Sequence, residues 1–151
     1  MKRFIFCALV LSLVSPLTAF ADGLTDFLSH VNVQARVNLP EFSTNISAQF
    51  GVPQAKVQVV LNSVREPADA FMVFQLGQMS GRSPEQVMAV YGPNKDKGWG
   101  VIAKELGIKP GSADFHALKN GNLSYKGKSS GNNDSSGNDK GKGKSKEKGH
   151  K

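Results

Sequence analysis

Apolar and polar residues alternate through residues 29–39. This period of two is typical of a half-buried β-strand, so a short strand is predicted here. One side would carry Val31, Val33, Ala35, Val37 and Leu39, and the other Asn32, Gln34, Arg36 and Asn38. A strand needs a partner, and no second clear strand pattern follows. Three arrangements stay open: pairing with a short neighbour, pairing with a second copy of the protein, or an irregular segment.

From Pro40 onward the apolar spacing changes to that of α-helices. A first helix is predicted from Pro40 to Phe50, before Gly51, and a second opens at Pro53. A third helix begins at Pro67 and is apolar almost all round. A helix without a polar face has to be enclosed, so this one is predicted to be the central, most buried helix.

The following segments carry clear helix boundary signals. Ser83 is placed as an N-cap with Gln86 three residues later, which predicts a capping box, and this helix is expected to stop at Gly92-Pro93. Apolar spacing predicts another helix over residues 99–106, and a last short one capped by Ser112. The predicted fold class is therefore mainly α: an irregular bundle of five or six short helices, with one short N-terminal β-strand and a disordered C-terminal tail.

Residues 1–21 have the organisation of a cleavable export signal. A lysine and an arginine precede the apolar run Phe4–Leu13, and small residues stand at 19 and 21, the positions that a signal peptidase reads. The apolar run is too short to span a bilayer, so no transmembrane anchor is expected in the mature chain. The protein is predicted to be periplasmic or secreted after cleavage near Ala21. The single cysteine, Cys7, lies within the signal, so the mature chain has no thiol chemistry.

The net charge of +7 is unevenly distributed along the chain. Residues 22–121 hold nine basic and nine acidic side chains, whereas residues 122–151 hold eight lysines against three acidic residues. The latter segment is rich in Gly, Ser, Asn and Asp, a composition that cannot bury enough apolar surface to fold. The sequence thus predicts a neutral helical domain over 22–121 and a disordered cationic tail over 122–151.

Several residues are candidates for metal or ligand binding, and each of them also has a purely structural interpretation. Asn94, Asp96 and Glu105 match three positions of a calcium loop, but the intervening Gly98-Trp99 pair replaces a ligand and the required glycine. The three histidines are scattered, so no metal or other cofactor is expected. Trp99 lies between two glycines, which suits either a binding platform or an aromatic anchor for the last helices.

Two alternative functions follow from other segments. Asp114 and His116 are near each other in sequence and would be the acid–base groups of a small periplasmic enzyme, although two residues apart on a helix they point to different faces. Residues 46–52 and 102–108 resemble the first half of a helix-turn-helix, which gives a nucleic-acid binder as the second alternative. Export and the neutral domain favour tight helix–helix corners instead, and no specific nucleic-acid partner is expected.

Two segments carry a family resemblance: PADAFM at residues 67–72, and GWGVIAKELGIKPGS at residues 98–112 followed by FH at 115–116. Over roughly residues 67–119 the chain resembles a group of small, uncharacterised exported bacterial proteins. The resemblance implies an origin in the bacterial envelope. It implies no activity, cofactor or site residue for this chain.

The sequence therefore favours a non-enzymatic extracytoplasmic interaction module with a flexible cationic tail. Its expected partner is an unknown protein or an anionic component of the envelope, and a second copy is an expected contact of residues 29–39. A solubilising role for the tail remains the alternative to a binding role. The candidate partner-binding residues are Trp99, His116, Lys140, Lys142, Lys144, Lys146 and Lys148.

Overall fold

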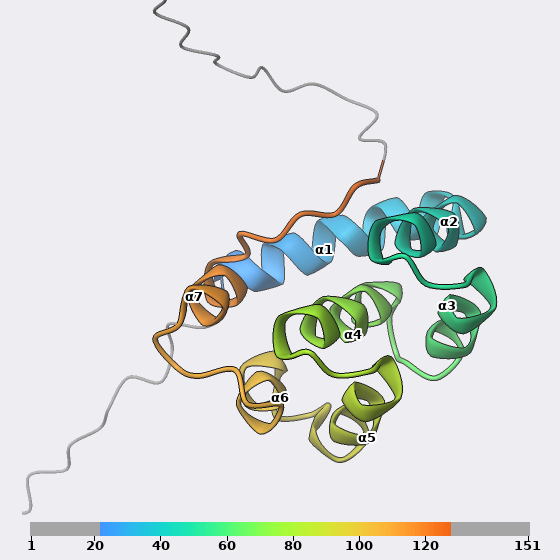
Figure 1. The fold of residues 1–151 in the computed structure, drawn as a ribbon. Coiled ribbons are helices and arrows are strands. Elements are labelled where there is room, and N and C mark those ends of the chain that lie inside the picture. The colour runs from blue at the N-terminus through green and yellow to red at the C-terminus, as the bar shows by residue number, and fades with distance from the viewer. Residues whose placement is uncertain (1–21, 128–151) are drawn as a thin grey trace, which may run out of the picture.

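The computed structural model describes residues 22–127, which contain seven α-helices (Figure 1). In chain order these are α1 (Asp22–Val37), α2 (Leu39–Phe50), α3 (Gln54–Leu61), α4 (Pro67–Ser80), α5 (Pro84–Asn94), α6 (Trp99–Glu105) and α7 (Ala113–Asn120). No strand occurs in this part of the chain. The predicted mainly helical class is confirmed, with more helices than the five or six expected.

The predicted strand over residues 29–39 is wrong, because these residues form the second half of α1 and the start of α2. The buried side chains Leu24, Val31 and Ala35 recur at helical spacing. Val33 and Val37, which the alternation placed on the same side, are 60% and 83% exposed. The alternation therefore joined residues of the buried and exposed faces of one helix. This segment offers no strand edge for pairing with a second copy.

The central position of α4 is the main feature of the core (Figure 1). It packs against α1, α2, α3 and α5, and the burial of most of its length confirms the prediction for this helix. The ring of Phe71 is fully buried and lies 5.3 Å from that of Phe27 and 5.7 Å from that of Phe50, measured between centroids. One aromatic side chain of α4 thus joins α1 to α2.

The helix boundaries follow the predicted caps, with one correction. The Ser83–Gln86 capping box is present, with the Gln86 side chain accepting a hydrogen bond from the Ser83 N–H at 3.0 Å. However, α5 does not stop at Gly92-Pro93 but continues to Asn94. Pro93 stands in the last turn of the helix, where its missing N–H costs a single bond. The Asn94 side-chain amide donates to the Val90 carbonyl at 2.9 Å within the same last turn.

Two glycines fix the start of α1 against the end of α7. Gly121 closes α7 in the left-handed conformation, with φ of 68°. A Cβ on Gly121 would collide with the backbone of Gly23, and a Cβ on Gly23 with the carbonyl of Asn120. The two helix ends can approach this closely only because both positions lack a side chain. Figure 1 shows α7 beside the N-terminal end of α1.

Residues 122–127 run along the helical body as an extended segment, which we call the strap (Figure 1). The Tyr125 ring packs against Phe42 and Phe71, with centroid distances of 5.4 and 6.0 Å. The Gln49 side chain donates to the Ser124 carbonyl at 2.7 Å and accepts from the Lys126 N–H at 2.8 Å. The packed body therefore continues beyond residue 121, where the sequence placed its boundary. The expected signal (1–21) and the rest of the expected tail lie outside the described residues.

Paired aspartate substitutions in α1 test the helical assignment. A strand would place Ala35 and Val37 on the same face, whereas the helix buries Ala35 fully and exposes Val37. Ala35→Asp is expected to lower the free energy of unfolding by about 3 kcal/mol, since it buries an unpaired carboxylate, and Val37→Asp to change it by less than about 0.5 kcal/mol. Urea denaturation measures both values. Equal losses for the two variants would contradict the helix.

Candidate functional site

A pocket of about 360 Å³ lies between the first turns of α1 and the start of α6. Leu24 and Leu28 of α1 form one wall, and Trp99 and Val101 of α6 form the other. This pocket is more enclosed than the surface hollows beside Leu39 or Val33. A concave, mainly apolar site of this size is typical of small-ligand binding.

The position of Trp99 depends on contacts that begin in α4. Gly98 has φ of 84°, a conformation that favours glycine, and it turns the chain into α6. The indole of Trp99 then stacks on the ring of Tyr91, with centroids 5.3 Å apart and an interplanar angle of 24°. The Tyr91 hydroxyl donates to Asp69 Oδ2 at 2.8 Å. Asp69 also accepts from the Glu66 N–H at 3.3 Å, as part of the capping box of α4.

The environment of Tyr91 keeps its hydroxyl protonated. Burial, followed by the hydrogen bond to Asp69, raises the pKa of Tyr91 to about 12. A neutral phenol is the form that donates to a carboxylate, so the contact between α5 and α4 persists at neutral pH. The stacked pair Tyr91–Trp99 is thereby tied to the first turn of the central helix.

The charged groups at the pocket are basic. Lys97 and Lys104 belong to its lining, which includes no acidic residue. Asp96, the acidic residue next to Lys97, is held by Arg65 with an N–O distance of 2.6 Å, and this guanidinium lowers the pKa of the Asp96 carboxyl. Glu105, the acidic residue next to Lys104, is exposed and does not belong to the lining. The Lys97 ammonium donates to Asn94 Oδ1 at 3.0 Å, a neutral partner. The pocket therefore combines apolar walls with two positive charges.

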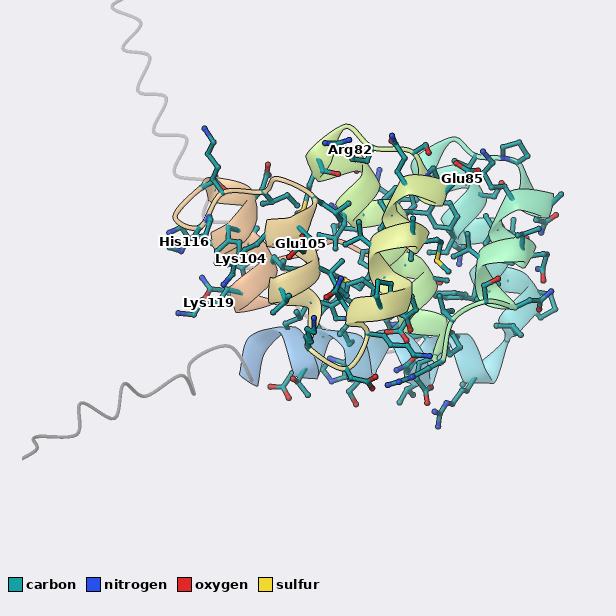
Figure 2. The ribbon with its side chains drawn as sticks, turned by 90° about the horizontal axis from the view of Figure 1, so that it is seen from below. Arg82, Glu85, Lys104, Glu105, His116 and Lys119 are labelled. Atoms are coloured by element: carbon teal, nitrogen blue, oxygen red, sulfur yellow. The ribbon has the colours of Figure 1, made fainter. Side chains whose placement is uncertain are left out.

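The candidate residues from the sequence fall into separate places. Trp99 is half-buried, and it both stacks on Tyr91 and lines the pocket, so it has the features of an anchor and of a platform. Asp114 and His116 are exposed on α7, and the structure forms no contact between them. Figure 2 shows His116 and Lys104 at the end of the molecule that α6 and α7 form. The five tail lysines, Lys140 to Lys148, lie outside the described residues.

The calcium-loop residues do not converge on a common point. Asn94 bonds to Val90 and Lys97, Asp96 pairs with Arg65, and Glu105 is exposed on α6 (Figure 2). In residues 22–127 no group of three histidine or acidic side chains is placed to hold a metal ion.

The two segments that resemble a helix-turn-helix form tight corners between helices. The Val52 N–H donates to the Ser47 carbonyl at 3.1 Å, and the Ile108 N–H donates to the Ala103 carbonyl at 3.0 Å. Both bonds span five residues and close the end of the preceding helix around a glycine with positive φ, Gly51 or Gly107. Each segment thus serves to reverse the chain.

The α1 wall of the pocket was missed by the sequence reasoning. Leu24 and Leu28 precede the alternating segment and were assigned to no element. Extending the window to Leu24 gives Leu24, Leu28, Val31 and Ala35, which have the spacing of one helix face. This longer pattern predicts a helix that includes the α1 wall of the pocket.

No protein-family model, curated protein or solved structure matches this chain. Within the described range, none of the helices combines the length and the apolar character needed to cross a bilayer.

Substituting Tyr91 by phenylalanine tests the link between α4 and the pocket. Loss of the hydrogen bond to Asp69 is expected to lower the free energy of unfolding at pH 7 by about 1–2 kcal/mol. An unfolded phenol ionises near pH 10, whereas folded Tyr91 keeps its proton to about pH 12. The stability that this group contributes is therefore fully present below pH 10 and is lost as the pH rises towards 12.

The measurement is urea denaturation at pH 7 and across this alkaline range. Tyr91→Phe is expected to lose less stability on alkalinisation than the wild type. Some loss remains, because burial also raises the pKa of Tyr125. Tyr125→Phe is the matched control. It keeps the contribution of Tyr91 to the free energy of unfolding and the loss of that contribution at alkaline pH. Identical alkaline losses in Tyr91→Phe and the wild type would contradict the assignment.

Proposed function

We propose that this protein is a non-enzymatic binding module of the bacterial envelope or extracellular space. In this proposal the helical body binds a ligand or partner at the Trp99 pocket, and the cationic tail holds the module near an anionic component of the envelope. The predicted export signal at residues 1–21 supports a location outside the cytoplasm. The observation that carries the proposal is the apolar pocket between α1 and α6, with its two lysines.

The construction of the pocket supports a binding role. Its walls come from helices far apart in sequence, and Trp99 is held in place through Tyr91 and Asp69. A preorganised site binds with a smaller loss of conformational entropy than a flexible one. Tyr91 connects the two segments of the family resemblance, since it contacts Asp69 of the first and Trp99 of the second.

The charge distribution supports the role proposed for the tail. The hydrogen bonds of Gln49 and the packing of Tyr125 hold the strap against α2 and the core. Residues 128–151 therefore continue from a fixed point on the domain, and they hold seven of the eight lysines that follow residue 121. Lysines spaced by glycine and serine attract polyanions through a salt-sensitive, sequence-independent interaction.

Chemical-shift mapping tests whether the pocket is the binding site. Trp99 is the only tryptophan, so its indole N–H gives a single cross-peak in a ¹H–¹⁵N spectrum. Titrating the labelled chain 22–151 with separated envelope fractions (lipid, polysaccharide and protein) is expected to shift this peak together with the amides of residues 24–28 and 97–101. The amides of α3 serve as the internal control, because α3 does not line the pocket. Absence of shifts with every fraction, or shifts confined to α3, would refute the proposed site.

A truncation after Gly127 tests the role of the tail. The shortened chain 22–127 keeps the strap and hence the packing of Tyr125, and circular dichroism checks its fold. Co-sedimentation with envelope fragments is expected to retain chain 22–151 at about 50 mM salt and to release most of it at about 500 mM, since screening weakens exposed charge contacts. Chain 22–127 is expected to be retained weakly at both concentrations. Equal retention of the two chains would leave the tail without a tethering role.

A further inference from the structure

We propose that the Trp99 pocket binds a small amphiphilic anion: an apolar chain of limited length that carries a carboxylate or a similar acidic group. This inference rests on the proposed function and names the ligand class for the same site. Each half of the ligand is assigned to a separate part of the pocket.

The apolar half of the ligand matches the walls. Leu24, Leu28 and Val101 present aliphatic side chains, and Trp99 presents the part of its indole that Tyr91 does not cover. A volume of about 360 Å³ lies at the small end of the range for ligand pockets, which suits a single apolar chain. Burial of methylene groups against these walls supplies the affinity.

The acidic half of the ligand matches the two lysines. Lys97 comes from the loop before α6 and Lys104 from the last turn of α6, so lysines from the two ends of one short helix belong to the pocket lining. The carboxylate of Asp96 is occupied by Arg65 and does not neutralise Lys97. With no acidic side chain in the lining, an anionic head group meets attraction and a cationic one meets repulsion.

Fluorescence of Trp99 reports binding directly, because the chain has no other tryptophan. The probes are octanoate, nonanoate and decanoate, each below its micelle concentration, added to the chain 22–151. Each added methylene is expected to tighten binding about four-fold, the ratio that corresponds to burial of one methylene group. Decyltrimethylammonium, which carries a cationic head group, is expected to bind at least ten-fold more weakly than decanoate. Decyl maltoside, which carries an uncharged head group, completes the comparison.

A charge-matched pair of variants locates the acidic group. Lys97→Ala combined with Lys104→Ala is expected to weaken decanoate binding about ten-fold and to leave decyl maltoside unchanged. Lys142→Ala combined with Lys144→Ala removes the same charge from the tail and is expected to change neither value. Equal effects of the two double variants would overturn the assignment of the head group to the pocket.

The remaining outcomes separate this inference from the proposed function. Equal affinity for decanoate and decyl maltoside would overturn the anionic ligand class while leaving the pocket as a binding site. A Trp99 response to anionic phospholipid vesicles with none to monomeric decanoate would replace the small ligand with a membrane surface and overturn the inference. A lack of response to every probe also overturns it, whereas the shift mapping with envelope fractions still decides whether the pocket binds a partner.

Discussion

The rest of the structure depends on the enclosure of α4. This helix is apolar almost all round, and most of its length is buried, so it is stable only when neighbouring helices surround it. Phe71 packs against α1, α2 and the strap through three aromatic contacts. The first turn of the same helix supplies Asp69, which holds Tyr91 and through it Trp99. One buried helix thus determines both the core and the position of the pocket wall.

Most helices were predictable from the sequence because their ends are encoded locally. Prolines at first turns, the Ser83–Gln86 capping box and the Ser112 cap require only neighbouring residues, and the structure forms each of them. The first helix was not predicted, since over a short window its valines fit a period of two as well as they fit a helix. Burial decides between the two periods, and burial comes from contacts with α4 and α7, which are remote in sequence. The strap escaped detection because the average composition of residues 122–151 hides Leu123 and Tyr125.

The candidate site was predictable only in part. Trp99 stood out because it is a single large aromatic residue between two glycines, and the structure gives it a pocket. The opposite wall comes from α1, about 75 residues away in sequence, and no local pattern connects Leu24 to Trp99. The hydrogen bond from Tyr91 to Asp69 is likewise a tertiary contact. Asp114 and His116 are close in sequence, but residues two apart on a helix point to different faces.

In the proposed mode of binding, α4 positions a preformed pocket in which the apolar chain of the ligand lies against Trp99. The most direct measurement is a set of intermolecular nuclear Overhauser effects between decanoate and the chain 22–151. Contacts from the alkyl protons to the Trp99 indole and to the methyl groups of Leu24 and Leu28 are the predicted result. Contacts confined to the exposed valines, Val33, Val37 and Val59, would show adsorption to the outer surface and would contradict the account.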